Sequence, residues 1–189
     1  MPPLSIDSDA ATPVADELLQ PGSIWELQAA LNLHARPSGP ALATQAAAGR
    51  RLQVLGPPPT VGLAGEPRRR RVRLLEDGYP GWIEPANLLG IAVAAARPRP
   101  RLLQRDAIRR LVSEVLAWAL AAADRPNTYL WGGSVGPDFD CSGIVQAAYA
   151  SVGVWLPRDA YLQERFCQPV ALRPGQYQLL EPGDLIFFG

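Results

Sequence analysis

Apolar and polar positions in the first half of the chain alternate over short segments. Four such segments predict β-strands, at 23–29, 51–55, 72–75 and 81–83. Turn sequences rich in Gly, Pro and Asp separate them, at 36–39, 56–59 and 76–81. Short strands at close spacing are typical of a small all-β barrel. We therefore expect a barrel domain over residues 22–95, after a disordered tail over residues 1–21 that shows no periodicity.

The second half of the chain shows a helical period instead. Apolar residues recur at three- and four-residue steps over 102–123, and further helices are predicted from Asp140 to about Val152 and over 158–166. Alternating Arg and Pro exclude a regular helix and indicate an extended linker over 96–101. A final apolar run at 185–188 predicts a central strand. The fold class is therefore α+β, with a second domain over 102–189.

Composition narrows the range of partners. The 189 residues are 48% hydrophobic and 19% charged, enough to bury a core, and 18 basic residues balance 18 acidic ones. A formal net charge of zero argues against nucleic acid or an anionic membrane as a partner, so we interpret the arginine run at 68–73 as a solvated loop and strand edge. The N-terminus lacks the basic and apolar regions of a secretory signal, which leads us to expect a cytoplasmic protein.

The two cysteines do not have the spacing of a metal site or of a disulfide scaffold, so we expect no metal and no cofactor. Cys141 lies at the predicted first turn of a helix, where free amide N–H groups and the helix dipole stabilise a thiolate. Gly143 beside it allows another group to approach the backbone closely. These features make Cys141 a nucleophile candidate. The alternative, a buried and inert cysteine, would be favoured for this residue without its neighbours.

Four motifs follow one another along the second domain: Y-x-W-G-G at 129–133, D-C-S-G at 140–143, L-P-R-D at 156–159 and P-G-D-L-x-F-F at 182–188. In this order they resemble the NlpC/P60 cysteine peptidases. The resemblance implies a papain-like fold and cleavage of peptidoglycan stem peptides between γ-D-glutamate and a diamino acid, with a free N-terminal L-alanine. The first domain resembles, more weakly, a bacterial SH3-type domain through residues 31–34 and 77–82. The pairing is similar to that of cytoplasmic enzymes that recycle muropeptides.

The resemblance also implies roles for single residues. Cys141 matches the nucleophile, and Tyr129 matches a tyrosine that helps to stabilise the oxyanion. Asp140 matches a carboxylate that pairs with the free amine of the substrate, while Trp131 shapes the pocket wall and Ser142 binds substrate or contributes its backbone N–H. Each has a structural alternative: Asp140 as a helix N-cap, Tyr129 as a core aromatic, and Ser142 as an ordinary residue of a first helical turn.

Three further residues match substrate-binding positions. Arg158 and Asp159 match a pair that follows the cysteine helix, and an arginine can hold a substrate carboxylate in bidentate fashion. An ordinary surface ion pair explains these two residues equally well. Tyr79 matches a tyrosine of the SH3-type domain that closes the subsite for alanine, with a loop aromatic as the alternative. Cys167 matches no position of the family, and we interpret it as structural or incidental.

The family uses a histidine base and a second polar residue that orients it, both after the G-D-L-x-F-F strand. The sequence stops at Gly189, and its single histidine, His34, lies in the SH3-like region, where we interpret it as an ordinary residue. We therefore expect a chain truncated before the catalytic histidine and inactive as a peptidase. Two alternatives remain open: a non-catalytic module that binds cell-wall peptides, and an amidase or acyl transferase on the same fold.

Overall fold

The computed structural model describes residues 16–56, 69–170 and 175–188. Most of the predicted tail (residues 1–15), residues 57–59 of a predicted turn, Arg68 and Gly189 lie outside the described residues. The last part of the predicted tail is ordered. A 3₁₀ helix η1 (Asp16–Leu18) precedes Leu19, which is only 2% exposed and belongs to the core of the first domain.

The first domain is built on one antiparallel sheet of seven strands. These are β1 (Ile24–Leu27), β2 (Leu31–His34), β3 (Leu42–Ala46), β4 (Arg51–Val54), β5 (Arg70–Leu74), β6 (Pro80–Ile83) and β7 (Ala92–Ala94). The strand order is β3-β2-β6-β5-β4-β1-β7. The four predicted strands are present as β1, β4, β5 and β6. Because β3 and β7 remain as the two edges among the described strands, the predicted closure into a barrel is not confirmed.

Alternation along the strands explains the core of this sheet. In β4 and β5 every second residue is buried, and Leu52, Val72 and Leu74 have no exposed surface. Successive side chains of a strand point to opposite faces, so one face supplies the core and the other meets solvent. After β6 a short 3₁₀ helix η2 (Pro85–Asn87) precedes Leu88, which is also fully buried.

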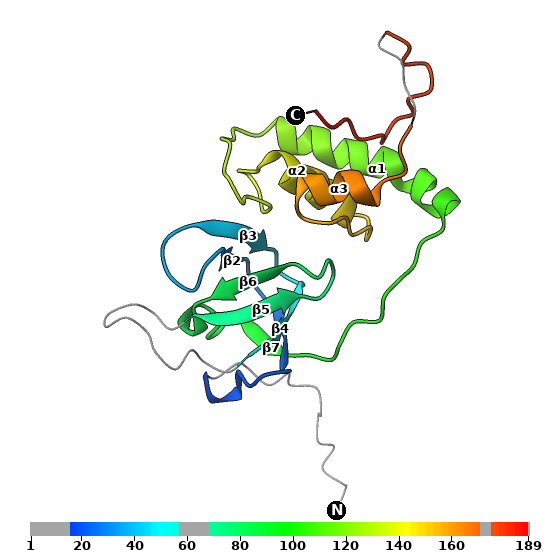
Figure 1. The fold of residues 1–189 in the computed structure, drawn as a ribbon. Coiled ribbons are helices and arrows are strands. Elements are labelled where there is room, and N and C mark those ends of the chain that lie inside the picture. The colour runs from blue at the N-terminus through cyan, green and yellow to red at the C-terminus, as the bar shows by residue number, and fades with distance from the viewer. Residues whose placement is uncertain (1–15, 57–68, 171–174, 189) are drawn as a thin grey trace, which may run out of the picture.

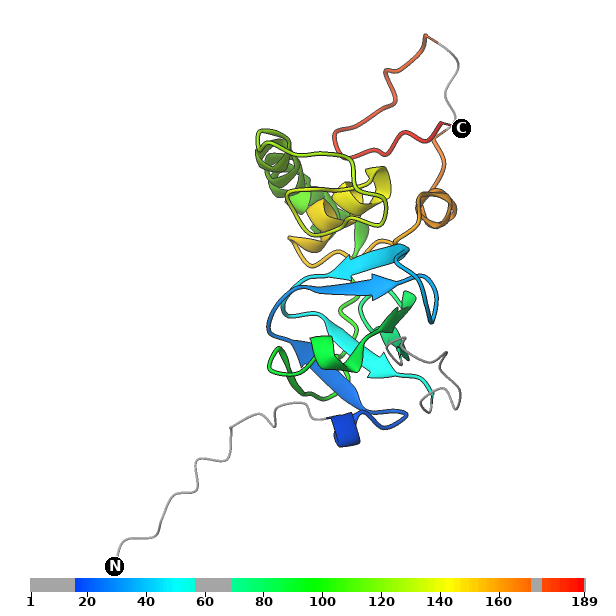
Figure 2. The same cartoon turned by 90° about the vertical axis from the view of Figure 1, so that its left-hand side faces the viewer.

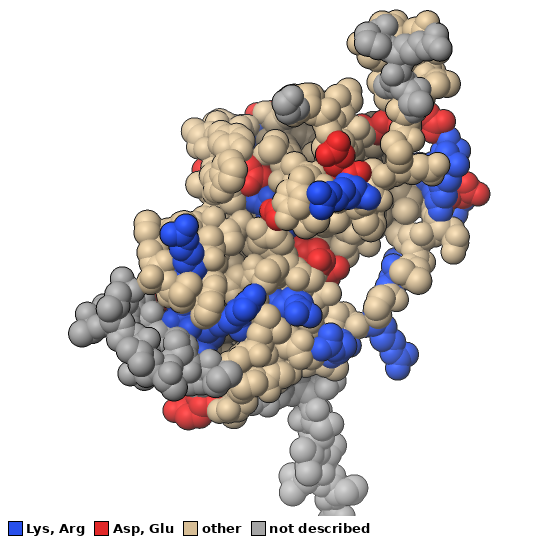
Figure 3. Space-filling model, in the orientation of Figure 1, with Lys and Arg blue, Asp and Glu red and all other residues tan. Residues whose placement is uncertain are grey.

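The arginine run at the start of β5 is less solvated than predicted. Arg69 is 6% exposed, forms an ion pair with Glu84 at 3.0 Å and donates to the carbonyls of Arg36 and Gly39. The strand itself lies inside the sheet, between β6 and β4. Buried arginines require such partners because an unpaired charge is costly away from water. Figure 3 shows that basic and acidic side chains are interspersed over the visible face of the molecule.

The second domain contains three helices, all of which the sequence predicts: α1 (Arg105–Ala123), α2 (Cys141–Ala150) and α3 (Ala160–Phe166). α1 and α2 pack against each other around a small apolar cluster that includes Val115, Ala148 and Leu156, and α3 packs against α2. Figure 1 shows the helices together on one side of the sheet domain, joined to it by a long extended segment. Within the described residues, no helix combines the length and the apolar character needed to cross a membrane.

The apolar run at 185–188 is not a strand, so that prediction is wrong for the described chain. A strand needs a neighbour to satisfy its N–H and C=O groups, and no described strand lies beside it. Ile186 is 69% and Phe188 92% exposed. The segment runs beside α1 in Figure 1, and the turn that precedes it is bound to α2, because the Tyr149 hydroxyl donates to the Gly183 carbonyl at 2.6 Å.

Candidate active site

The helix α2 begins directly at Cys141. Asp140 is its N-cap, with extended backbone angles, and its Oδ1 accepts a hydrogen bond from the Gly143 N–H at 2.7 Å. Aspartate is among the preferred residues at this position because it satisfies a free amide of the first turn. The Cys141 side chain is exposed. Cys141 thus lies in the first turn of the helix, as predicted. Because its side chain is exposed, the alternative of a buried, inert cysteine is wrong.

The loop before α2 carries two exposed aromatic side chains, Tyr129 and Trp131, with exposed fractions of 65% and 76%. Partial desolvation first, and then the neighbouring Cys141 and Asp140, raise the pKa of Tyr129. The hydroxyl therefore stays protonated at neutral pH and is available as a donor beside the thiol. High exposure excludes the alternative of a core aromatic for Tyr129.

The glycines of the two motifs have a steric role. A Cβ at Gly143 would lie 2.0 Å from the Gly133 carbonyl oxygen, so the loop and the helix approach more closely than any other residue allows. Gly132 has φ +82°, which favours glycine, and its N–H donates to Asp140 Oδ2 at 2.8 Å. W-G-G and D-C-S-G are therefore two sides of one contact.

Arg158 is the centre of the polar contacts behind the nucleophile. It is 2% exposed, and each of its five N–H groups has an acceptor. Two go to the Asp140 carboxylate, from Nη1 to Oδ1 at 3.0 Å and from Nη2 to Oδ2 at 2.7 Å. The other three go to Ser142 Oγ at 2.9 Å, the Gly133 carbonyl at 3.3 Å and Thr44 Oγ1 at 2.8 Å. The interpretation of Arg158 as part of a surface pair with Asp159 is wrong.

Asp140 is saturated by these contacts. Its two oxygens accept from Arg158, from the N–H groups of Gly143 and Gly132, and from the Ser142 hydroxyl at 3.3 Å. Burial by itself would raise the pKa of Asp140, but the Arg158 guanidinium and the two N–H groups outweigh it, so the pKa lies below its ordinary value. Asp140 thus acts as the N-cap. Its role toward a substrate amine stays a prediction, and an incoming ammonium would compete with five donors.

Asp159 and Tyr79 come together from different domains. The Tyr79 hydroxyl donates to Asp159 Oδ1 at 3.1 Å. Burial, followed by the charge of Asp159, raises the pKa of Tyr79 to about 12, so the hydroxyl remains a donor. Asp77 orients the turn that carries this tyrosine, because its carboxylate accepts from the Tyr79 N–H at 3.0 Å and from Gln146 of α2 at 2.8 Å. Both domains therefore contribute to this part of the site.

Several residues of the site were not predicted. Thr44 and Gln45 of β3, together with Ser134 of the loop, connect the sheet to the base of α2, and Figure 2 shows the β2–β3 hairpin directly beneath the helical domain. The segment 41–48 is rich in alanine, which is uncommon in strands, so it carries no clear strand signal. The turn at 76–81 that contains Asp77 was predicted, but not its contact with α2.

The sequence's single histidine lies elsewhere in the sheet domain. His34 is on β2, opposite Trp82, with its Nε2 3.9 Å from Glu84 Oε1. Within the part of the chain that the structure describes, no group of three or more His, Cys, Asp or Glu side chains is arranged to hold a metal ion.

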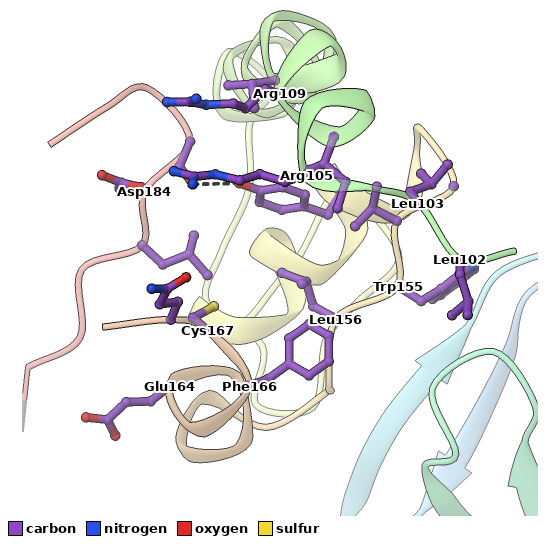
Figure 4. A pocket seen from close by; sticks show the side chains of 18 of the residues that line it. Leu102, Leu103, Arg105, Arg109, Trp155, Leu156, Glu164, Phe166, Cys167 and Asp184 are labelled. Atoms are coloured by element: carbon purple, nitrogen blue, oxygen red, sulfur yellow. Dashed lines mark hydrogen bonds between the residues drawn. The ribbon is translucent and has the colours of Figure 1, made fainter. Parts of the chain in front are cut away.

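A separate cavity lies at the other end of α2 (Figure 4). The linker, α1, α3 and the segment 180–187 line it, with Leu103, Trp155, Phe166 and Cys167 among its side chains. Burial, followed by the charge of Asp184, raises the pKa of the Cys167 thiol. Cys167 is therefore held as a neutral thiol and is not a second nucleophile of the Cys141 kind.

Comparison with protein families matches residues 126–189 to the NlpC/P60 family and residues 33–88 to the bacterial dipeptidyl-peptidase Sh3 domain. The chain is 43% identical over 60 residues to the gamma-D-glutamyl-L-lysine dipeptidyl-peptidase of Bacillus cereus, covering 32% of this chain and 16% of that protein. It is 33% identical over 108 residues to the peptidoglycan endopeptidase RipB of Mycobacterium tuberculosis, covering 52% of this chain and 42% of that protein.

The chain thus spans less than half the length of either curated relative. A solved NlpC/P60 family protein from Bacillus cereus aligns with 85% of this chain and 45% of its own, at 20% identity and a TM-score of 0.31. The sequence matches identify both parts of the molecule, in the order that the motifs predicted. The chain therefore joins a bacterial SH3 domain to an NlpC/P60 domain of the cysteine peptidase family.

Proposed function

We propose that this protein hydrolyses peptides derived from peptidoglycan at the bond between γ-D-glutamate and a diamino acid. One observation carries the proposal: the exposed thiol of Cys141 lies at the first turn of α2, with the Tyr129 hydroxyl beside it. The relative from Bacillus cereus, named for the γ-D-glutamyl-L-lysine bond, supports the choice of substrate class. We further propose a role in recycling cell-wall peptides in the cytoplasm, which cell fractionation would test.

The geometry suits acyl transfer to sulfur. The Cys141 thiolate attacks the γ-carbonyl carbon of the substrate, and the carbonyl oxygen takes up the negative charge. Within the described residues the backbone N–H groups of Cys141 and Ser142 have no acceptor, and they point out of the helix N-terminus, as such groups do. Together with the Tyr129 hydroxyl, they are suitable donors for the oxyanion. Collapse of this intermediate breaks the C–N bond, leaves a thioester on Cys141 and releases the amine, which takes a proton from a general acid; water then hydrolyses the thioester and restores the thiol.

For the free amine of the substrate we propose Asp159 in place of Asp140, the residue that the family resemblance suggested. Asp140 is 8% exposed and its oxygens already accept five hydrogen bonds. Asp159 is half-buried, and its only hydrogen-bonded side-chain oxygen within the described chain is Oδ1, which accepts from Tyr79. Its Oδ2 is therefore free for an ammonium group, and a charge-assisted bond there would make a free N-terminus a requirement.

We also infer that the 189 residues by themselves do not complete the reaction. Their single histidine, His34 on β2, lies 3.9 Å from Glu84, and the Tyr129 hydroxyl beside the thiol is protonated at neutral pH, so it cannot accept the proton of the thiol. A chain of these residues is expected to bind the peptide without cutting it. The same chain continued along its reading frame into a histidine-bearing segment is expected to cut it.

The test uses the peptide L-Ala-γ-D-Glu-meso-diaminopimelate, its L-lysine counterpart and the N-acetylated form of each. Cleavage of the free peptides by the continued chain, loss of cleavage in Cys141→Ser, and poor cleavage of the acetylated forms are expected. Asp159→Asn should abolish the preference for the free amine, with Tyr79→Phe as a milder matched change. Binding without cleavage by the continued chain would replace the peptidase proposal with that of a binding module.

A further inference from the structure

We propose that Thr44 and Gln45, on strand β3 of the SH3 domain, are positioning residues for the Cys141 nucleophile. On this view the SH3 domain does more than contribute Tyr79 to a subsite, because it also holds the base of α2 and the loop that carries Tyr129. The inference rests on the proposed role of Cys141. It is carried by a connected set of hydrogen bonds that crosses the boundary between the domains.

Thr44 supplies the acceptor for the Nε–H group of Arg158. Its side chain is fully buried, and its Oγ1 accepts from Arg158 Nε at 2.8 Å and shares a hydrogen bond with Ser134 Oγ at 3.0 Å. A hydroxyl both donates and accepts, so one Thr44 oxygen can serve both neighbours. Of the five donors of Arg158, Nε is the one whose acceptor lies in the SH3 domain.

Gln45 holds the loop in the manner of a neighbouring strand. Its backbone N–H donates to Ser134 Oγ at 3.1 Å, and its carbonyl accepts from the same hydroxyl at 2.8 Å. Its side-chain Oε1 accepts from the N–H groups of Ser134 and Val135, both at 3.2 Å. The amide nitrogen donates to Asn32 Oδ1 at 3.0 Å, which fixes this orientation of the side chain.

The edge strand also approaches the loop sterically. A Cβ at Gly132 would lie 2.9 Å from Leu42 Cγ of β3, so the W-G-G turn rests directly on this strand. Gly132 in turn donates to Asp140. The β3 edge, one of the two edges of the sheet among the described strands, is thus covered by the loop of the active site.

The contacts lead from β3 to the nucleophile in two steps. Thr44 binds Arg158, and Arg158 neutralises the carboxylate of Asp140, which precedes Cys141 in the chain and caps its helix. Without the Thr44 oxygen, a buried N–H of Arg158 would lose its acceptor, which disfavours the present position of the guanidinium. A less well neutralised Asp140 would then disfavour a thiolate at Cys141 through like-charge repulsion.

The experiment measures alkylation of Cys141 by iodoacetamide as a function of pH, in a Cys167→Ser background that leaves one thiol. Thr44→Val removes the acceptor at nearly constant volume, and Thr44→Ser retains it. Gln53→Ala changes a glutamine on β4 whose hydrogen bonds, to Gly22 and Arg97, stay away from the helical domain, and serves as the control. Thr44→Val should slow alkylation at neutral pH about fivefold and displace the curve to higher pH, while the other two variants should match the parent.

Hydrogen exchange of residues 129–143 provides a readout that does not depend on the thiol. Thr44→Val and Gln45→Ala should raise exchange in this segment, with strands β4 and β5 unchanged as an internal reference for folding. An unchanged pH curve and unchanged exchange in Thr44→Val would overturn the inference, as would an equal effect of Thr44→Ser or Gln53→Ala. If instead Cys141→Ser leaves peptide cleavage unchanged, the proposed function fails, and the exchange result alone still decides whether β3 positions the loop.

Discussion

The two ends of α2 are built on different physical principles. At its N-terminus, buried polar groups meet one another with full hydrogen bonding: Asp140, Ser142 and Arg158 are each less than a tenth exposed. At its C-terminus, Tyr149 donates one hydrogen bond to the Gly183 carbonyl and otherwise borders, with Cys167, an open cavity lined by loosely packed apolar side chains and by exposed charged ones; Phe166 there is 64% exposed. Hydrogen bonds are directional and specify one geometry, whereas apolar contacts are not directional and leave the arrangement open. The nucleophile end of α2 is therefore the more tightly specified of the two.

Breaking the buried ion pair should have the largest effect. Arg158→Met leaves Asp140 buried without its counter-charge, and we expect a loss of about 3–5 kcal/mol in the free energy of unfolding. Urea denaturation followed by tryptophan fluorescence would measure it. The control, Arg71→Met, changes an exposed side chain of β5 and should stay within about 0.5 kcal/mol of the parent. A loss for Arg158→Met no larger than that of the control would contradict the importance of the pair.

Filling the close contact at Gly143 should come next. In Gly143→Ala the new Cβ meets the Gly133 carbonyl, a backbone atom that cannot move freely, and we expect a loss of about 1–3 kcal/mol. At the other end of α2, Gly183→Ala places a Cβ 2.9 Å from Val112 Cγ1 at a residue whose φ of +94° strains alanine; because the Val112 side chain can move, about 1 kcal/mol is expected.

Thermal denaturation of these two variants would rank them. Gly56→Ala is the control, because a Cβ there meets nothing within 4 Å and its φ is not positive. A larger loss for Gly183→Ala than for Gly143→Ala would reverse the comparison between the two ends.

The two cysteines allow the two ends of α2 to be compared by their reactivity, because Cys141 lies at one end and Cys167 near the other. Exposed Cys141 should be alkylated roughly tenfold faster than Cys167 at neutral pH, because Cys167 is partly buried and its pKa is raised by burial and by Asp184. The ratio should shrink as the pH rises and Cys167 ionises. Peptide mapping by mass spectrometry after timed alkylation measures both rates, with Cys141→Ser isolating the slower one. Equal rates at neutral pH would refute the distinction.

The smallest expected effect is that of Asp140 on how the free energy of unfolding changes with acid pH. The folded-state pKa of Asp140 lies below its unfolded value, so its stabilising contribution is present above about pH 4 and is lost as the pH falls through the lower folded-state pKa. Asp140→Asn should remove this part of the acid slope in urea-unfolding experiments.

A comparable carboxylate lies near the C-terminal end of α2: the pKa of Glu181 is also lowered, by its ion pair with Arg109. The Glu181 and Arg109 side chains are exposed, and solvent screens such a pair. Glu181→Gln should therefore leave the dependence of stability on acid pH unchanged. If the free energy of unfolding falls with acid equally in the parent and in Asp140→Asn, the Asp140–Arg158 pair does not contribute to the pH dependence of stability.

Much of this arrangement was predictable from local patterns. The helices α1 and α2 follow from apolar periodicity, and the N-cap at Asp140 follows from the preference of aspartate for that position. Strand β3 was missed because 42–46 contains two alanines and only one β-branched residue, so its pairing with β2 and not its propensity makes it a strand. The run at 185–188 has the opposite character: it has strand composition but no described strand to pair with.

The order of the two domains, the position of Cys141 at a helix start and the motifs that identify the family could all be read from the chain, because these features depend on neighbouring residues. Three contacts emerge only from the folded molecule: Arg158 is a buried partner of Asp140, Tyr79 meets Asp159, and Thr44 accepts from Arg158. These pairs are separated by 18, 80 and 114 residues in the chain. Burial and charge neutralisation bring such groups together, and no local pattern records which distant residue will supply the acceptor.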